Sequence, residues 1–418
     1  MRTTSLTLLL GVLLLVAQTT GATTYYAAPN GSGSCKTTQG SPGSFAASTG
    51  CLKPGDRLEL AAGTYTDRPT SWAGGTSDAA RVTIAGVSAA TVIIRAGPPS
   101  GQGAMLYINV SYITFENLTL DGINYSKDNS HDLMKITDGA SHVRLSHVVL
   151  MNSVGINPPT GAAAGILIGP PGYNEFLNME AKNNRGYAFY MASPNNLVDH
   201  LNCHDNGRYC LHVYSDSGGV NNNIIRNSRI WNNGHNSYGC WGGCTNDGMV
   251  LSSGSGHLVY NNLIYNSGAG GIQVDADNVK LYNNTIVSNN GDCIHGNGSA
   301  TSQNNICWQN HGNITVGGTA DHNLFSDPKF VGANAGDFHL QSGSPAIKAG
   351  VDLSNVFTDD FAGMTRPPGP FDLGVLAVGG TGGGGGGDGV ASLPAPRNLR
   401  LVTTPVGPQS SATPPKAP

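Results

Sequence analysis

Short apolar strands recur along the middle of the chain, separated by turns rich in glycine and asparagine. Seven of these strands have apolar residues at the inward positions, and they begin at Met134, Ile166, Phe189, Leu211, Met249, Ile272 and Ile294. Four of the six spacings between successive starts are 22 or 23 residues; the others, 32 and 38, fit the same unit with a loop inserted. This period predicts stacked repeats that together bury what one unit cannot.

A second strand follows in each unit and ends on asparagine, as in "HVVLMN", "NNLIYN" and "NNICWQN". Each unit is therefore predicted to contain a strand, a turn, a second strand and an Asn turn, with glycines permitting tight corners. No segment keeps a helical apolar period through these glycines, and a β-propeller needs units nearly twice as long. The sequence predicts an all-β fold: a single-stranded right-handed parallel β-helix, or solenoid, with an Asn ladder at one corner.

The two ends of the chain differ in composition from this repeat region. The apolar run "LTLLLGVLLLVA" is too short to span a bilayer and precedes small residues, so residues 1–22 are predicted to be a cleaved signal peptide. We expect the β-helix to occupy 23–378, with a cap and first coils at 23–105, core repeats at 106–330 and a closing segment at 331–378. Residues 379–418, a Gly-rich linker and a Pro/Ser/Thr-rich tail, are expected to be disordered.

Export makes the eight cysteines candidates for disulfides, and Cys35–Cys51 and Cys240–Cys244 are the local pairs expected first. Zinc is disfavoured because Cys240 and Cys244 have no second CxxC or paired histidine nearby. The net charge of -4, without basic blocks, argues against nucleic acid as a partner. We expect an extracellular monomer with no membrane span, secreted or associated with the cell surface.

Both ends of the predicted β-helix resemble a known group of proteins. The stretches "YYAAPNGSGSC" and "CLKPGDRLELAAGTY", within 25–65, look like the cap and first coil of secreted bacterial parallel β-helix proteins. "FHLQSGSPAIKAG" (338–350) resembles their closing segment, whereas "FDLGVLAV" departs from the Asp-Ile-Gly-Ala-Tyr-Glu-like strand with which such chains usually finish. The resemblance implies the fold, and fold alone does not fix function.

Aligning the coils on their strand starts predicts lateral neighbours about 4.8 Å apart. One residue after each start, the outward column reads Lys135, Leu167, Tyr190, His212, Val250, Gln273 and His295. Two residues before each start, the column reads Asp132, Ala164, Tyr187, Tyr209, Asp247, Gly270 and Asp292. The densest coil is "HDNGRYCLHVYSD" (204–216), in a chain with only 11% charged residues. This coil therefore belongs to one polar, aromatic face.

Two inserts, 153–163 and 234–246, enter just before a strand start and are expected to stand as walls along one edge of this face. The floor between them is about three coils, or roughly 15 Å, wide, which is room for about three sugar rings. Such a groove fits an extended polymer. We expect substrate-binding residues on its floor and far wall: Tyr187, Tyr214, Trp241, Gln273 and His295.

Abstraction of the C5 proton of a polyuronate needs a group that neutralises the carboxylate, a base and an acid for the leaving oxygen. Arg208, or the more distant Lys135, can bind the carboxylate, and His212 is a base near neutral pH. Tyr209, Tyr190 or Tyr214 can protonate the leaving group. This face resembles that of β-helix polysaccharide lyases and mannuronan epimerases in residue type and place, without a diagnostic motif. The sequence therefore predicts a lyase that acts on an acidic polysaccharide by β-elimination.

Other functions use the same residues. No cofactor is required by the motifs, although Asp247, Asp275 and Asp216 are candidates to bind Ca²⁺. Asp247 with Asp275 or Asp292 can also form the carboxylate pair of a glycoside hydrolase, and a C5-epimerase shares the proton abstraction.

A protein of another class, a non-catalytic glycan-binding or adhesive β-helix, needs no catalytic groups at all. Under that hypothesis Lys135, Gln273 and His295 are ordinary surface residues, and the tyrosines pack against the first insert. His200 and His204 lie on the second strand and are assigned to structure or surface, as are the Asn columns.

Overall fold

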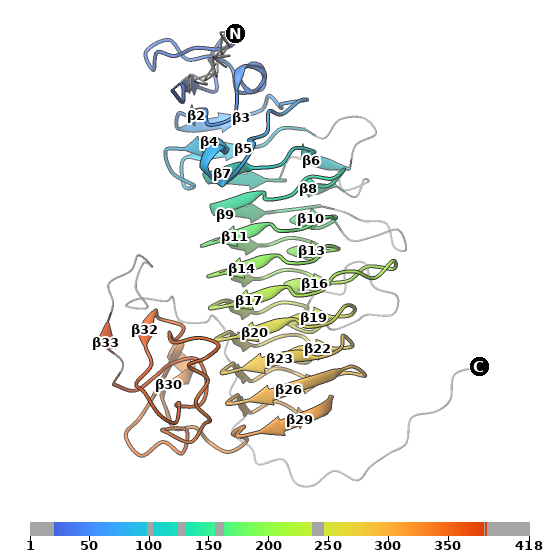
Figure 1. Ribbon diagram of the computed structural model, residues 1–418, viewed down its shortest axis with the longest axis vertical. Helices are drawn as coiled ribbons and strands as arrows, with labels where there is room; N and C mark the ends of the chain where they lie inside the picture. Colours follow the sequence, from blue (N-terminus) through green and yellow to red (C-terminus); the bar gives the residue numbers. More distant parts are fainter. Residues whose placement is uncertain are drawn as a thin grey trace, which may run out of the picture.

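The computed structural model describes residues 21–97, 103–123, 131–154, 163–235 and 246–379, and the backbone of 381–382. Short parallel strands stack into one long column of coils (Figure 1). Residues 1–20, most of both inserts with Trp241 and the Cys240–Cys244 pair, and most of the tail lie outside the described residues. The predictions made for them stay predictions.

One face of the column is a parallel sheet of nine strands, to which each coil contributes one. Its strands are β6 (Ala104–Ile108), β8 (Asp132–Ile136), β10 (Ile166–Ile168), β13 (Phe189–Met191), β16 (Leu211–Val213), β19 (Met249–Leu251), β22 (Ile272–Val274), β25 (Asp292–His295) and β28 (Gly312–Ile314). We call this the nine-stranded face. It contains every strand start predicted from the spacing.

The remaining faces belong to a sheet of 20 strands. The N-terminal strands are β1 (Thr24–Ala27), β2 (Arg57–Leu60), β3 (Gly63–Tyr65), β4 (Val82–Gly86), β5 (Val92–Ile94), β7 (Ile113–Asp121) and β9 (Arg144–Met151). The later coils each supply two, the first being β11 (Glu175–Leu177), β14 (Leu197–Asp199), β17 (Ile224–Arg226), β20 (Leu258–Tyr260), β23 (Val279–Tyr282), β26 (Ser299–Gln303) and β29 (Gly317–Asp321). The second are β12 (Glu180–Lys182), β15 (Asn202–His204), β18 (Arg229–Trp231), β21 (Leu263–Tyr265), β24 (Thr285–Val287) and β27 (Ile306–Trp308).

The predicted right-handed parallel β-helix is confirmed, but most coils have three strands where the sequence predicted two. The additional strand is short and half polar, as in Glu175–Leu177 and Leu197–Asp199, so it carries too little alternation to be recognised. The one helix outside 3-10 turns is the short α1 (Phe45–Ser48) of the N-terminal cap, within the described ranges.

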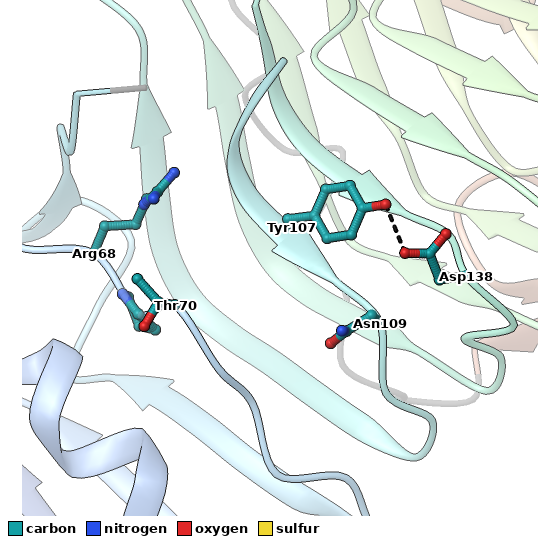
Figure 2. A pocket seen from close by; sticks show the side chains of 6 residues that line it. Arg68, Thr70, Tyr107, Asn109 and Asp138 are labelled. Atoms are coloured by element: carbon teal, nitrogen blue, oxygen red, sulfur yellow. Dashed lines mark hydrogen bonds between the residues drawn. The ribbon is translucent and has the colours of Figure 1, made fainter. Parts of the chain in front are cut away.

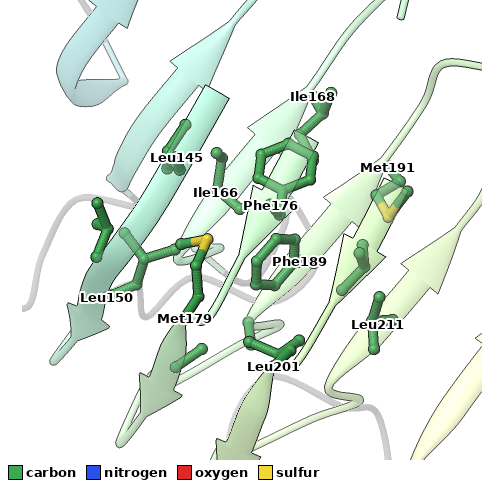
Figure 3. Close-up of a cluster of buried hydrophobic side chains, with 14 of the residues drawn as sticks. Leu145, Leu150, Ile166, Ile168, Phe176, Met179, Phe189, Met191, Leu201 and Leu211 are labelled. Atoms are coloured by element: carbon green, nitrogen blue, oxygen red, sulfur yellow. The ribbon is translucent and has the colours of Figure 1, made fainter. Parts of the chain in front are cut away.

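The core is a continuous apolar column inside the coils. Residues at the strand starts and two positions later are fully buried, including Ile166, Ile168, Phe189 and Met191. Phe176 meets Phe189 edge to face, with ring centroids 5.3 Å apart, in the layer that Figure 3 shows. Because each layer contacts the next, burial is shared along the column rather than gathered in one globular centre.

Asparagine ladders run at three corners of the coil, not at one as predicted. They join the side chains of Asn174–Asn196–Asn223, Asn184–Asn206–Asn233 and Asn284–Asn305–Asn323. The residue before a ladder position adopts the left-handed conformation that asparagine tolerates, as at Asn183 (φ 54°) and Asn283 (φ 48°). Each ladder side chain thus caps backbone groups that the turn leaves without a strand partner.

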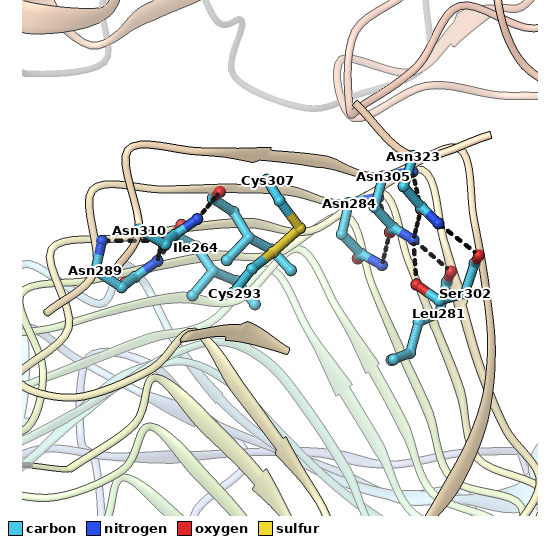
Figure 4. Close-up of a disulfide and its surroundings, with 11 residues drawn as sticks. Ile264, Leu281, Asn284, Asn289, Cys293, Ser302, Asn305, Cys307, Asn310 and Asn323 are labelled. Atoms are coloured by element: carbon cyan, nitrogen blue, oxygen red, sulfur yellow. Dashed lines mark hydrogen bonds between the residues drawn. A yellow bond between two sulfur atoms is a disulfide. The ribbon is translucent and has the colours of Figure 1, made fainter. Parts of the chain in front are cut away.

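Replacing Asn305 by alanine is expected to lower the free energy of unfolding by about 2–4 kcal/mol. Asn305 accepts the backbone N–H of Asn284 at 2.9 Å and donates to the carbonyl of Leu281 at 2.8 Å, and all of these groups are buried (Figure 4). Urea unfolding measures the loss. The exposed Asn290 is the matched control, since its replacement by alanine should change stability by less than about 0.5 kcal/mol. Equal losses in both variants would contradict a structural role for the ladder.

Residues 330–378, which we call the C-terminal lobe, lie along the side of the column rather than stacked as a further coil (Figure 1). The lobe contains the short strands β30 (Phe330–Gly332), β31 (Asp337–Leu340) and β32 (Met364–Thr365), the last paired with β33 (Thr381–Gly382). Phe330 and Phe338 pack on Tyr265 and neighbouring side chains of β21, β24 and β27. Leu373, Val375 and Leu376 of the atypical "FDLGVLAV" segment are buried in this contact, and Phe371 packs in a second cluster with Tyr260 and Tyr282.

Three disulfides lie within the described residues. Cys35–Cys51 is confirmed, whereas Cys203–Cys210 and Cys293–Cys307 were not predicted. Both cross the interior. Cys203 of β15 bonds to Cys210, which directly precedes β16, and Cys293 of β25 bonds to Cys307 of β27; all four residues are buried. Such pairs are near in space because a coil turns a corner, which sequence spacing alone does not reveal.

Candidate functional site

The predicted column of outward residues exists on the nine-stranded face. Register pairs join Lys135 to Leu167, Leu167 to Tyr190, Tyr190 to His212, His212 to Val250, Val250 to Gln273 and Gln273 to His295. The same column continues upstream to Tyr107 on β6. One member departs from the prediction, since Val250 is only 2% exposed.

Aromatic rings gather on β13 and β16, near the middle of the column. The ring of His212 has four tyrosine neighbours, at centroid distances of 5.2 Å (Tyr187), 5.2 Å (Tyr190), 5.3 Å (Tyr209) and 5.4 Å (Tyr214). Tyr214 stacks parallel to the imidazole, and Tyr190 meets it edge to face. We call these five residues the tyrosine–histidine cluster. The sequence alignment of coils therefore brought together residues that do lie in contact.

Arg208 joins this cluster from the corner that precedes β16. Its Nη1 donates to the hydroxyl of Tyr187 at 2.6 Å, and its guanidinium lies 5.1 Å from the centre of the same ring. The Cys203–Cys210 disulfide closes the loop that carries Arg208 and Tyr209, with Cα atoms 6.0 Å apart. A covalent link at both ends of this loop restricts where the cation can lie relative to His212.

His212 is a neutral imidazole over most of the pH range. Burial, with a smaller contribution from the positive charge of Arg208, lowers the pKa of His212 to about 4. Its Nε2 lies 3.1 Å from the hydroxyl of Ser252, while its Nδ1 is buried with no hydrogen-bond partner among the described residues. An imidazole with one unpartnered nitrogen has an unused site for a proton. The sequence predicted that His212 is a base with a pKa near neutrality. Its burial among the tyrosine rings lowers that pKa.

Tyr190 and Tyr214 of the cluster are protonated at neutral pH. Burial raises the pKa of Tyr190 to about 12. The hydroxyl of Tyr214 donates to Asp216, and this bond raises the pKa of Tyr214. Among the described residues the hydroxyl of Tyr190 has no carboxylate partner, so Tyr190 can donate its proton, whereas the hydroxyl of Tyr214 already donates to Asp216.

Lys135 lies outside the cluster. It is two register steps from Tyr190, or about 10 Å, and its Nζ is 3.6 Å from a carboxylate oxygen of Asp132. Burial raises the pKa of Asp132 to about 6, although the backbone N–H of Ala164 donates to it at 2.7 Å. Lys135 thus contacts Asp132 and lies outside the tyrosine–histidine cluster.

Asp247 and His295 form a hydrogen-bonded pair that sequence alignment did not predict. His295 Nε2 lies 2.9 Å from Asp247 Oδ1, across one intervening coil. The coil between them has Gly270, where a Cβ would lie 2.8 Å from Asp247 Oδ1 and 2.9 Å from a carbon of the imidazole. The contact with Asp247 raises the pKa of His295. Gly270 has no side chain between Asp247 and His295. Its presence in the aligned column is the signal in the sequence that could have indicated this pair.

The three predicted calcium ligands have separate partners. Asp247 accepts from His295, Asp275 from Gln273 at 2.6 Å, and Asp216 from Tyr214. No group of three His, Cys, Asp or Glu side chains within the described ranges lies close enough to hold a metal ion. The structure thus does not bring Asp216, Asp247 and Asp275 together, and a calcium requirement stays a prediction.

Sequence reasoning missed Ser252 and Tyr107. Ser252 occupies the same position of its coil as Tyr214 and Asp275, three residues after the strand start, so the alignment contained it without giving it a role. Tyr107 precedes the first repeat recognised from the spacing. Conversely, His204 is structural as expected, because it bonds to Glu180 and Asp205 and stacks on Trp231 at 4.5 Å.

Known structures share this architecture. A crystal structure of the pectate lyase Pel9A superposes with a TM-score of 0.65 at 20% identity, over 85% of this chain and 96% of that one. A rhamnogalacturonan lyase superposes with a TM-score of 0.53 at 14% identity, over 77% and 97%. A mannuronan C-5 epimerase module of Azotobacter vinelandii is more distant, with a TM-score of 0.44 at 16% identity, over 66% and 91%.

At these identities the likeness to the two lyases establishes the parallel β-helix fold of the chain. No protein-family model matches the sequence, and the comparison with curated proteins found no match. Within the described ranges, none of the helices has the length and apolarity needed to cross a membrane. What the chain does must be argued from the site.

Proposed function

We propose that this chain is a secreted enzyme that cleaves an acidic, uronate-containing polysaccharide by β-elimination at the tyrosine–histidine cluster. The observation that carries the proposal is the contact of a cation, a neutral imidazole and protonated tyrosines on one outward sheet face. These are the three kinds of group that the reaction needs. The fold shared with two lyases is consistent with it.

In the proposed reaction Arg208 binds the uronate carboxylate and stabilises the negative charge that develops on it. The C5–H bond breaks and the proton moves to Nδ1 of His212. This step requires the tyrosine rings around His212 to separate as the polymer binds. The electron pair forms the C4–C5 double bond while the C4–O bond breaks. Tyr190 or Tyr209 gives its proton to the departing oxygen. The products are a new chain end and an unsaturated uronate.

A glycoside hydrolase that uses Asp247 with Asp292 or Asp275 is less well supported, because Asp247 already accepts hydrogen bonds from His295 and from the Gly270 N–H. A C5-epimerase would use the same base and differ in where the proton returns. The disulfides within the coils and the apolar N-terminal run support export.

The test is the ultraviolet absorbance of unsaturated uronate during incubation with alginate, pectate, chondroitin sulfate or hyaluronan. Each polymer is tested with calcium and with chelator. A steady rise on one polymer is the expected result and identifies the substrate and the metal requirement together. If no polymer gives an absorbance rise but reducing ends are released, the reaction is hydrolysis and not elimination. If no polymer changes in either assay, glycan binding is left as the function.

We predict that kcat/KM falls on the acid side with an apparent pKa near 4, well below the ordinary histidine value. The proton acceptor is the neutral imidazole, which is present above this pKa and lost as the pH falls through it.

The stability of the folded chain should depend on the same titration. Since the unfolded chain binds this proton more readily between about pH 4 and 6.5, the folded state loses stability as the pH falls through that range.

An NMR titration of His212 measures the pKa directly, and Arg208→Gln should raise it because one cause of the depression is removed. His322, an exposed histidine far along the chain, is the internal reference. An acid limb near pH 6.5 in kcat/KM, together with an ordinary titration of His212, would contradict the assignment.

A further inference from the structure

A pocket opens at the N-terminal end of the nine-stranded face, away from the tyrosine–histidine cluster. The segment after β3 lines one side of it with Arg68, Pro69 and Thr70. Tyr107, Asn109 and Asp138, from β6 and the turns beyond β6 and β8, line the other (Figure 2). Its volume of about 280 Å³ is of the size of a small-ligand site.

The polar groups in this pocket suit a sugar acid. The hydroxyl of Tyr107 donates to Asp138 at 2.7 Å, which fixes the carboxylate as an acceptor for a sugar hydroxyl and holds the phenol ring in place (Figure 2). Asn109 and Thr70 supply further polar groups. Asp138 occupies the left-handed region, with φ 54°, at the turn after β8, so the backbone itself places this side chain.

Arg68 is the cation of the pocket. Within the described residues its guanidinium has neither a hydrogen bond nor an ion pair, although most other arginines of the chain have one or both. The carboxylate of the neighbouring Asp67 forms no ion pair with Arg68 within the described residues and accepts the backbone N–H of Ala46 at 2.8 Å. Arg68 as a residue is half-buried, and a guanidinium without a carboxylate partner, beside hydroxyl and amide groups, suits bidentate binding of a carboxylate.

The pocket is in line with the proposed cleavage site. Tyr107 belongs to the outward column, four register steps from His212 through Lys135, Leu167 and Tyr190. Four steps of about 4.8 Å make about 19 Å, the length of about four sugar units in an extended chain. Lys135 lies between the two places, so a polyuronate along the column passes Arg208, Lys135 and Arg68 in turn.

We propose that the Arg68 pocket is a distal subsite that binds one uronate of the polymer about four units from the bond that is cleaved. The inference rests on the proposed function and goes beyond it, since it assigns residues of the N-terminal coils to substrate binding. Its consequence is a preference for long chains, because a short oligomer placed at His212 does not reach Arg68.

Kinetics on oligomers of defined length test the subsite. The probes are trimers and octamers of the polymer on which the wild-type enzyme forms unsaturated product. Arg68→Ala should raise KM for the octamer about 10-fold or more, with kcat little changed, and leave KM for the trimer as it was. The matched control is Arg144→Ala, an arginine of the 20-stranded sheet paired with Glu175. Equal effects of Arg68→Ala on both oligomers, or none on either, would overturn the proposal.

A second measurement separates failure of the subsite from failure of the proposed reaction. Affinity electrophoresis in gels containing pectate, alginate, chondroitin sulfate or hyaluronan detects binding without turnover, and a dextran gel is the neutral reference. Retardation in one acidic gel that Arg68→Ala weakens and Arg144→Ala preserves is expected even if no product is formed. Retardation that Arg68→Ala leaves unchanged contradicts the subsite, whether or not the enzyme is active.

Discussion

Replacing Arg208 by alanine is expected to lower kcat/KM for the polymer that the enzyme cleaves by about 10²–10³-fold. The negative charge that develops on the substrate carboxylate then lacks the guanidinium that stabilises it. Arg208 lies against Tyr187, to whose hydroxyl it donates at 2.6 Å, so its guanidinium is held beside the tyrosine–histidine cluster. His212→Asn should lower the same constant by about 10²–10⁴-fold, through loss of the base. Formation of unsaturated uronate, followed by its ultraviolet absorbance, measures both.

The controls distinguish chemistry from folding. Arg208 and His212 lie on the outward side of the sheet, so both variants should retain a cooperative unfolding transition with a midpoint close to that of the wild type. Arg208→Lys should recover only part of the activity, since an ammonium does not bind a carboxylate in two places. Undiminished turnover in Arg208→Ala would show that elimination, if present, occurs elsewhere on the face, with the Asp247–His295 pair the next candidate.

Replacing Arg366 by methionine is expected to cost about 3–5 kcal/mol of stability through the loss of several buried hydrogen bonds from a charged donor, the largest loss we predict for one substitution. Arg366 is only 4% exposed and donates to the carbonyls of Gly374 at 2.9 Å and Asp372 at 3.3 Å within the C-terminal lobe. It also donates to the side chain of Asn261 on the β-helix at 2.9 Å. Methionine fills similar space but leaves the buried side-chain oxygen of Asn261 without a donor, whereas the carbonyls of Gly374 and Asp372 keep only the Asn283 side chain as a donor.

Urea unfolding checks this prediction. Lys348→Met is the matched control, because Lys348 belongs to the same lobe and is exposed, and its replacement should change stability by less than about 0.5 kcal/mol. A further expectation concerns how the lobe fails. In Arg366→Met it should become sensitive to protease before the coils do, since one of its hydrogen bonds to the β-helix, that from Arg366 to Asn261, is gone. Similar unfolding of both variants would mean that apolar packing alone holds the lobe.

Coil spacing was sufficient to predict the fold and the lateral order of the site. Because the strands are parallel and in register, a correct strand start fixes every neighbour, and Tyr190 and His212 were placed side by side from the sequence. The packing of side chains above the sheet surface, and the pKa values that depend on it, could not be predicted in this way. The low pKa of His212 comes mainly from its burial under the tyrosine rings. An alignment of repeats does not show how rings are oriented.

Other features escaped prediction for the opposite reason, that they cross the column. The Cys203–Cys210 disulfide joins β15 to the residue before β16, on a different face, through the interior. The Asp247–His295 contact passes over a whole coil at Gly270. Arg68 comes from the cap and reaches the face from its side. An alignment of repeats treats each position as having one neighbour above and one below, so it misses contacts of these kinds.

The C-terminal lobe also changes how the column can come apart. In a solenoid each coil contacts only the next, so coils can fray one at a time from an open end. The lobe touches Trp231, Tyr260, Tyr282 and Ile306, which belong to four successive coils, and so fastens them together along their length. Fraying that starts at the last coils must therefore detach the lobe first. The coils before Trp231 have no such fastening in the described residues, and under tension we expect the chain to separate there.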